Sequence, residues 1–154
     1  MSFNYSETRK ERTNWRDQEL SNRHRQWGFN CPAIDIDFLM VEYNSGSPVA
    51  LIDYKRYTGT INNVNPKSFN AITVIANNSY IPFFVVYYWD KIWAFRVEPV
   101  NDIAKKAIER ESNKTDFSER EFVTFLYRLR NININPQEQN ILSKLNNDMP
   151  PQQK

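Results

Sequence analysis

Apolar residues along this chain gather in short runs separated by turn-forming residues, which is the spacing of β-strands. The first two runs cover 36–43 and 48–56, and the segment 44–47 between them is rich in turn residues. A third, nearly unbroken run at 81–89 is typical of a strand that is covered on both faces. The run at 92–98 follows it as a further strand. We therefore expect a β-hairpin followed, after a gap, by two more strands.

Apolar residues at helical spacing occur in that gap and again after the last of these strands. The pair Asn65–Pro66 caps a predicted helix at about 66–77, and its position between two strands predicts a right-handed crossover that sets 81–88 parallel to 48–56. The sequence thus predicts an α/β fold, with a mixed sheet centred on the hairpin, a crossover helix and a helical C-terminal part. Capping residues mark the other predicted helices, at 14–26 and after Asn101, Ser118 and Asn135. The crossover helix should bury Phe69, Ile72 and Ile75 against the strands.

The length of the chain and the composition of its two terminal segments predict the domain organisation. At 154 residues the chain suits one domain with a single core. Residues 1–13 are polar and charged without periodicity, so we expect a flexible arm there. A single domain should follow over 14–146, with a flexible tail at 147–154.

Composition narrows the classes of function. The net charge of +2 is mildly basic, which is compatible with a nucleic-acid partner without requiring one. The single cysteine, Cys31, excludes an internal disulfide framework and cysteine-rich zinc sites, and the single histidine, His24, excludes a histidine metal cluster. The chain has no apolar run of transmembrane length and no signal-peptide pattern, so we expect a cytoplasmic location and no membrane partner.

Three charged residues interrupt the hairpin where strands normally carry apolar side chains. Asp37 lies in the first strand, while Asp53 and Lys55 lie two residues apart in the second and therefore on one face. Two carboxylates supply the hard oxygen ligands that Mg²⁺ prefers, and a nearby lysine can position a water for attack on a phosphate. The three residues therefore fit phosphodiester hydrolysis. Asp35 shares the face of Asp37 and competes with it as the first metal ligand.

The register of the hairpin decides whether Asp37 meets the other two residues. An even sum of paired residue numbers puts Asp37 on the face of Asp53 and Lys55, whereas an odd sum turns it away. A two- or four-residue loop gives the odd sum, and a three-residue loop at 45–47 with a glycine-assisted bulge gives the even one. The site therefore requires an odd-length loop or a bulge. We also expect three apolar residues of that face to anchor the carboxylates at the rim of a core: Leu39, Val41 and Leu51.

The charged hairpin resembles the motif of the PD-(D/E)xK nuclease superfamily, which is an Asp on one strand and (Asp/Glu)-x-Lys on the next. Here the motif reads Pro32 and Asp37, then Asp53–Tyr54–Lys55, although Pro32 is not adjacent to Asp37. The upstream stretch RHRQWG at 23–28 is similar to a signature of small bacterial and phage proteins with the same hairpin. The resemblance covers roughly 21–100 in outline and implies a restriction-endonuclease-like core.

The resemblance also implies a function. It predicts a Mg²⁺-dependent nuclease, with Mn²⁺ as an alternative cofactor, that hydrolyses phosphodiester bonds with DNA favoured as the substrate. Asp37 and Asp53 would be catalytic residues that hold the metal, and Lys55 would be the third catalytic residue. Basic residues on either side of the hairpin are candidates for nucleic-acid contact: Arg23, His24, Arg25 and Lys67.

Two other interpretations stay open at this stage. In the first, Asp53 or Asp37 forms a cross-strand ion pair with Lys55 on a half-exposed sheet, and the chain is a non-catalytic module that binds nucleic acid or protein. In the second, the chain is a structural or inhibitory protein whose aromatic core supports a protein-binding surface. Whether the chain forms a homodimer is also open. Glu42 lies near the turn on the opposite face, where we expect it to be solvated.

Overall fold

The computed structural model describes residues 19, 23, 26–27, 36–59 and 66–152 of the chain. The chain divides into two units, Met1–Asp35 and Ile36–Lys154, and the second unit contains the whole sheet. In the first unit, Glu19, Arg23 and the 26–27 pair have helical backbone. The rest of the predicted helix at 14–26 lies outside the described residues, as does Cys31.

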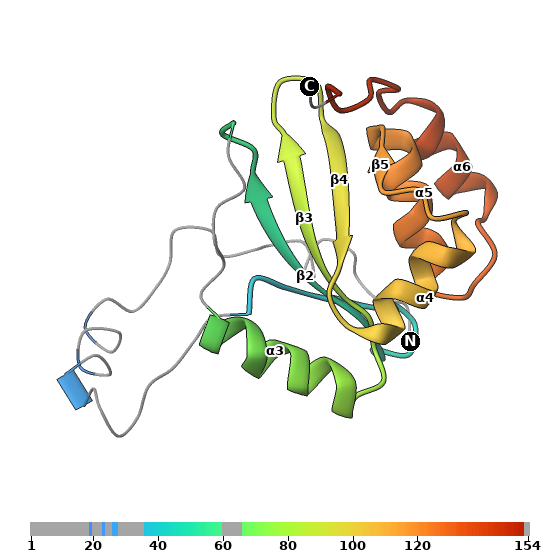
Figure 1. Cartoon of the computed structure of the whole chain (residues 1–154). Helices are drawn as coiled ribbons and strands as arrows, with labels where there is room; N and C mark the ends of the chain where they lie inside the picture. Colours follow the sequence, from blue (N-terminus) through green and yellow to red (C-terminus); the bar gives the residue numbers. More distant parts are fainter. Residues whose placement is uncertain (1–18, 20–22, 24–25, 28–35, 60–65, 153–154) are drawn as a thin grey trace. The chain divides into compact units, whose positions relative to one another are not determined.

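Five strands and four helices make up the described part of the second unit (Figure 1). The strands are β1 (Phe38–Val41), β2 (Pro48–Arg56), β3 (Phe83–Trp89), β4 (Ala94–Pro99) and β5 (Asp116–Phe117). The helices are α3 (Pro66–Asn78), α4 (Asp102–Arg110), α5 (Glu119–Leu129) and α6 (Pro136–Ser143). This is the α/β class that the alternation of strand and helix patterns predicts.

The strands form one mixed sheet in the order β1-β2-β3-β4-β5. β1 is antiparallel to β2, and β4 is antiparallel to both β3 and β5. β2 and β3 are parallel, with Leu51 opposite Phe83 and Arg56 opposite Tyr88, and α3 connects them. The predicted parallel pairing across a helical crossover is therefore confirmed.

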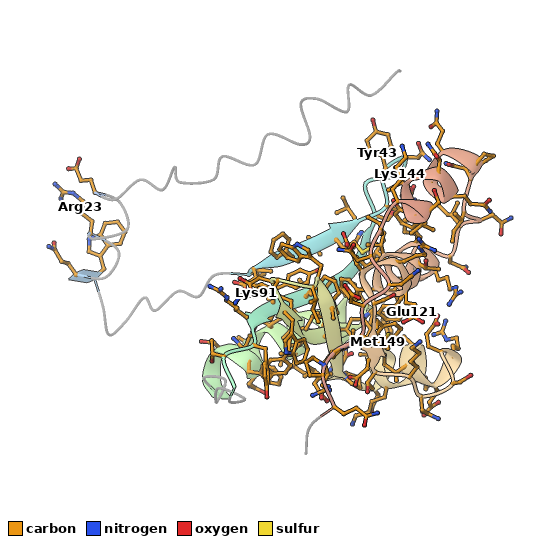
Figure 2. The ribbon with its side chains drawn as sticks, turned by 90° about the horizontal axis from the view of Figure 1, so that it is seen from above. Arg23, Tyr43, Lys91, Glu121, Lys144 and Met149 are labelled. Carbon is orange, nitrogen blue, oxygen red and sulfur yellow. The ribbon has the colours of Figure 1, made fainter. Side chains whose placement is uncertain are left out.

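The two faces of the sheet carry different layers. Ile52, Phe84 and Val97 pack with residues of α4 and α5 on one face, which we name the α4–α5 face. Seen from above, side chains fill the space between the sheet and these helices (Figure 2). Leu51 and Phe83 pack with α3 on the other face, which we name the α3 face. α3 lies across the end where β2 and β3 begin (Figure 1), so the far end of this face is not under α3.

The contacts of α3 correct part of the prediction for that helix. Ile72 and Ala76 are buried and Phe69 is half-buried against the sheet, as the apolar stripe predicts. Ile75, however, is 45% exposed, so the prediction that it is buried is wrong. The reason is the helical period, since residues 69, 72 and 76 follow the 3–4 spacing of one face and residue 75 lies beside it.

The helices after the sheet begin where the sequence predicts. Asn101, Ser118 and Asn135 are the N-caps of α4, α5 and α6, and the last two form complete capping boxes with Glu121 and Glu138. Asn101 is also buried and joins three elements. Its side chain accepts hydrogen bonds from the Phe83 and Ala104 amides and donates to the Ile81 carbonyl and the Asn77 side chain.

Several strand bounds differ from the prediction, since β3 and β4 begin at Phe83 and Ala94 rather than at 81 and 92. The first strand is shorter than the predicted 36–43, because β1 contains only Phe38–Val41. The short strand β5 at Asp116–Phe117 has no counterpart in the prediction. Two residues carry no alternating pattern, so only pairing with β4 reveals this strand.

Candidate active site

The register of the β1–β2 hairpin meets the requirement for a shared face. Phe38 lies opposite Ile52, and Met40 lies opposite Ala50, so the paired numbers have an even sum. The register shifts between Met40 and Val41, and Val41 lies opposite Pro48. This shift leaves Val49 as an extra residue on β2, which is a β-bulge. Continued by one position beyond Phe38, the register sets position 37 opposite position 53.

The bulge has a different origin from the one that the sequence suggests. The loop is closed by a hydrogen bond of 2.8 Å from the Glu42 amide to the Ser47 carbonyl, which corresponds to four loop residues and an odd register. Gly46 takes a φ of +68° within this loop, where a side chain would be strained. The extra residue at Val49 then restores the even register within β2. A four-residue loop and a bulge outside it together give the even register that a shared face requires.

The prediction that Glu42 is solvated is wrong, because the residue is buried with only 8% of its surface exposed. Its carboxylate accepts hydrogen bonds from the backbone amides of Asn44 at 3.1 Å and Ser45 at 2.8 Å. The Ser45 hydroxyl donates a third, at 2.8 Å. These bonds, with that from Asn44 first, lower the pKa of Glu42 below its ordinary value. Glu42 therefore holds the loop that fixes the hairpin, and it does not belong to the charged site.

Asp53 and Lys55 lie together on the α3 face. They follow buried Leu51 at steps of two along β2, so all three side chains share one side of the strand. The Lys55 Nζ is 3.2 Å from the Asp53 Oδ2, and the two side chains are 27% and 16% exposed. Between them Tyr54 points to the other face, where burial raises its pKa to about 12. The two charged groups thus sit partly covered at the edge of the core under α3.

Asp37 lies directly before β1 and is exposed. The competing residue Asp35 lies outside the described residues.

The prediction of an apolar rim is correct for Leu51, which is buried, and wrong for Leu39 and Val41, which are 51% and 49% exposed. β1 is the edge of the sheet, so apolar side chains there are covered only in part.

The basic candidates are described only in part. Arg23 is exposed and its guanidinium lies 3.5 Å from the carboxylate of Glu19, four residues earlier. His24 and Arg25 lie outside the described residues. Lys67 belongs to the first turn of α3, and its side chain also lies outside the described part.

A row of polar residues that the sequence analysis missed extends the α3 face beyond Lys55. Lys55 lies opposite Tyr87 on β3, Tyr87 opposite Arg96 on β4, and Arg96 opposite Asp116 on β5. We name these four residues the Lys55 row. Arg96 is fixed in it by two hydrogen bonds to the Asp116 carboxylate, of 2.7 and 3.0 Å. These bonds raise the pKa of Arg96.

A second row runs beside the first and contains Asp53, Val85 and Glu98. The pKa of Glu98 is raised, because partial desolvation and, to a smaller extent, the negative charge of Asp116 outweigh the effect of Arg96. The pKa of Tyr87 is also raised, first by burial and then by the charges of Glu98 and Asp53. Both carboxylates of the second row therefore act on the Tyr87 phenol.

Aromatic rings close the far end of this face. Tyr57 stacks on Trp89 with 4.5 Å between ring centroids, and the Arg96 guanidinium lies 5.4 Å from the Trp89 ring centre. Trp89 is thus contacted by its neighbours on both sides of β3.

The carboxylate oxygens of the candidate site are ligands of the type that Mg²⁺ prefers. Mg²⁺ is commonly held by one or two carboxylates together with substrate phosphates and waters, and Asp37 and Asp53 are the carboxylates that would share one face if the register continues one residue beyond β1. Within the described ranges, no group of three or more His, Cys, Asp or Glu side chains is placed to hold a metal ion. The candidate site therefore consists of two carboxylates and one lysine.

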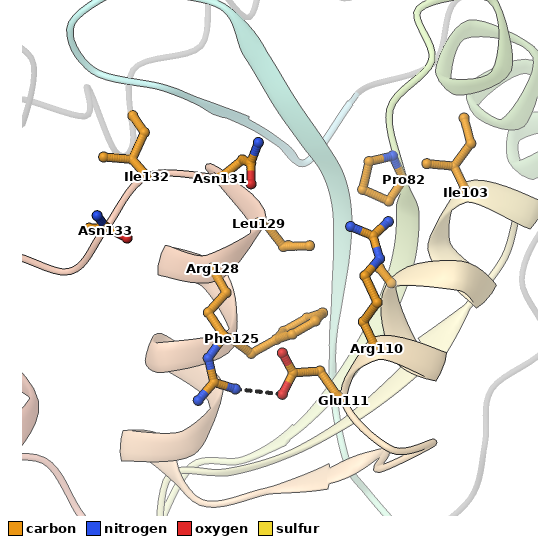
Figure 3. A pocket seen from close by; sticks show the side chains of 11 residues that line it. Pro82, Ile103, Arg110, Glu111, Phe125, Arg128, Leu129, Asn131, Ile132 and Asn133 are labelled. Carbon is orange, nitrogen blue, oxygen red and sulfur yellow. Dashed lines mark hydrogen bonds and ion pairs between the residues drawn. The ribbon is translucent and has the colours of Figure 1, made fainter.

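A pocket of about 450 Å³ lies elsewhere, between α4 and α5 (Figure 3). Its floor includes buried Phe125 and Ala107, which belong to the core of the α4–α5 face. At its rim the Arg128 guanidinium and the Glu111 carboxylate form an ion pair of 2.6 Å. The pocket is thus separated by the sheet from Asp53 and Lys55, and it contains none of the predicted site residues.

Comparisons with protein-family models, with curated proteins and with solved structures find no match for this chain. The resemblance to the PD-(D/E)xK superfamily therefore rests on the sequence of the hairpin. In the described part of the chain, no helix is long and apolar enough to cross a membrane.

Proposed function

We propose that this protein is a Mg²⁺-dependent nuclease with a restriction-endonuclease-like core, and that it hydrolyses phosphodiester bonds in DNA. The register of the hairpin is the observation that carries the proposal. It gives an even sum through a bulge at Val49, and continued by one residue beyond β1 it would bring position 37 to the face of Asp53 and Lys55.

The order of elements supports the same proposal. The charged hairpin is followed by α3 and by a strand parallel to β2, which is the arrangement that the resemblance implies around an Asp and an (Asp/Glu)-x-Lys motif. Asp53 and Lys55 lie directly beyond the part of the sheet that α3 covers. The core thus holds the two side chains firmly while leaving them accessible to a substrate.

The proposed mechanism assigns a role to each residue. Asp37 and Asp53 would hold the Mg²⁺, and the bound ion would neutralise charge on the phosphate and lower the pKa of a water. The Lys55 ammonium donates hydrogen bonds that orient the attacking water and stabilise the negative charge that develops on the phosphate. Hydrolysis joins the water oxygen to phosphorus, breaks the bond to the leaving oxygen and transfers a proton to that oxygen. Asp53 fixes the lysine, since the two groups are 3.2 Å apart.

Phosphate contact away from the cleaved bond is assigned to the basic residues named above. Arg23, His24, Arg25 and Lys67 would each neutralise one backbone phosphate and give affinity without base specificity. The first three belong to the unit Met1–Asp35, whereas the sheet belongs to the unit Ile36–Lys154.

Cleavage of supercoiled plasmid tests the proposal. The wild type should nick the plasmid in Mg²⁺ or Mn²⁺ and not in EDTA, and Asp37→Asn, Asp53→Asn and Lys55→Ala should each lower the rate at least about 100-fold. Asp90→Asn is the matched control, because Asp90 pairs with Arg56, which projects from β2 on the opposite side from Lys55. Its rate should equal the wild-type rate. A wild type that cleaves no form of DNA with either metal would end the proposal.

The pocket favours a second candidate function, that of a non-catalytic binding module. Its apolar floor and its rim of arginine, glutamate and asparagine side chains are typical of a ligand site. This function is the one that remains if the plasmid assay shows no metal-dependent cleavage.

A further inference from the structure

Tyr87 occupies a special place beside the proposed site. It is the residue opposite Lys55 in the parallel β2–β3 pair, so the two side chains leave the α3 face about 4.8 Å apart. The preceding residues of β3 on this face are Phe83 and Val85, which are both apolar and buried. Tyr87 is thus the first position along β3 on this face that carries a polar group, and it lies at the level of Lys55.

The ring and the hydroxyl of Tyr87 have different surroundings. The residue is 6% exposed, so its ring belongs to the core. In the described part of the chain, none of the hydrogen bonds involves this hydroxyl, and it is not among the side-chain atoms that are fully enclosed without a hydrogen-bond partner. The hydroxyl therefore reaches the surface of the α3 face with its donor unused. Phenylalanine would fill the core equally well, so packing does not explain the oxygen.

The charges around the hydroxyl limit what it can bind. Asp53 lies on one side in β2 and Glu98 on the other in β4, and both act on the phenol electrostatically. A phosphate oxygen placed near two carboxylates needs hydrogen-bond donors that offset the repulsion. Lys55 is one such donor, but it already pairs with Asp53. A phenol is a neutral donor at neutral pH and can add a hydrogen bond to an anion without another charge.

We propose that Tyr87 is a further catalytic residue of this site, and that its hydroxyl donates a hydrogen bond to a non-bridging oxygen of the phosphate to be cleaved. The inference rests on the proposed nuclease function and adds to it a second donor beside Lys55. The two donors come from adjacent strands of a buried sheet, so their spacing is fixed before the substrate arrives. Glu98 repels the phosphate from the β4 side and so confines it over Lys55 and Tyr87.

Tyr87→Phe tests the inference, because it removes the oxygen and keeps the ring. The next residue provides a matched control: Tyr88 points to the α4–α5 face, where it packs against the core. In Mg²⁺, Tyr87→Phe should lower kcat for plasmid nicking about 10- to 100-fold with KM changed less than about threefold, since the bond strengthens in the transition state. Tyr88→Phe should cleave at the wild-type rate.

Two further measurements separate catalysis from folding and from the parent proposal. The dissociation constant of a fluorescein-labelled duplex oligonucleotide in Ca²⁺, measured by anisotropy, should change less than about threefold in Tyr87→Phe. The reason is that the hydrogen bond from Tyr87 is weaker in the ground state than in the transition state. Thermal melting sets an assay temperature at which every variant is folded. A wild type that cleaves while Tyr87→Phe cleaves equally fast would overturn this inference alone. A wild type that does not cleave would overturn the proposed function and this inference together.

Discussion

The Lys55 ammonium lies 3.2 Å from the Asp53 carboxylate, two residues away on the same strand. The contact therefore runs along β2, whereas the sequence analysis considered an ion pair across two strands. If the register continues one residue beyond β1, position 37 shares the face of both residues, and Asp53 would then have an attractive neighbour in Lys55 and a repulsive one in Asp37. In the proposed site, a pair arranged in this way would contribute little to folding and would suit the binding of a cation.

A double-mutant cycle measures this difference. With side chains only 16% and 27% exposed, a purely structural pair predicts that Asp53→Asn and Lys55→Ala each cost about 1–3 kcal/mol and that the double mutant recovers part of the loss. Our account predicts a smaller effect for Asp53→Asn, because the change also removes repulsion from Asp37. Urea unfolding of the four proteins at pH 7 without metal gives the coupling energy. A large coupling with full rescue would favour the structural interpretation.

The Glu42 loop gives a pH-dependent prediction. The pKa of Glu42 is lowered in the folded state, so its carboxylate stabilises the fold above its ordinary value of 4.5 and this contribution is lost as the pH falls through the folded pKa. Glu42→Gln should therefore lower the melting temperature at pH 7, and the difference from wild type should shrink in acid below pH 4.5.

Glu98 provides a control of the opposite sign. Its pKa is raised, so the ionised carboxylate opposes folding above the folded pKa, and Glu98→Gln should raise the melting temperature at pH 7. Both differences should vanish in strong acid, where each carboxyl is protonated. A Glu42→Gln difference that is the same at pH 7 and in strong acid would mean that the charge of Glu42 does not hold the loop.

Asn101 is predicted to matter more than an ordinary cap. It is buried and its side chain forms four hydrogen bonds that join the end of α3, the start of β3 and the first turn of α4. Asn101→Ala should cost about 2–4 kcal/mol, because it removes a cap and leaves buried groups unpaired. The exposed cap Asn135 is the control, and Asn135→Ala should cost about 1 kcal/mol. Equal losses in urea unfolding would show that the buried network adds nothing.

The sequence predicts most of the secondary structure because each element carries local signals. β2 has its predicted bounds, and Asn101, Ser118 and Asn135 cap the helices that follow them. The short strand β5 escapes prediction, because two residues form a strand only through their partner. Ile75 was assigned to the buried stripe although the helical period already places it at the edge.

The candidate site is predictable only in part, for a similar reason. Asp53 and Lys55 are detected because charges two apart interrupt an apolar strand. The same signal exists in β4, where Arg96 and Glu98 are two apart, and it could have been used. Tyr87 carries no such signal, because its place opposite Lys55 depends on the register of two parallel strands. The bulge at Val49 is likewise a property of pairing and not of a residue type.

The location of a bound divalent cation tests the central claim most directly. A crystal of the full chain soaked in Mn²⁺ allows the ion to be located by its anomalous scattering. Our account predicts a peak between Asp37 and Asp53, with a carboxylate oxygen of each at about 2.0–2.6 Å, and no direct bond to Lys55. No peak at this position under saturating Mn²⁺, or Asp37 on the opposite face from Asp53, would contradict the account.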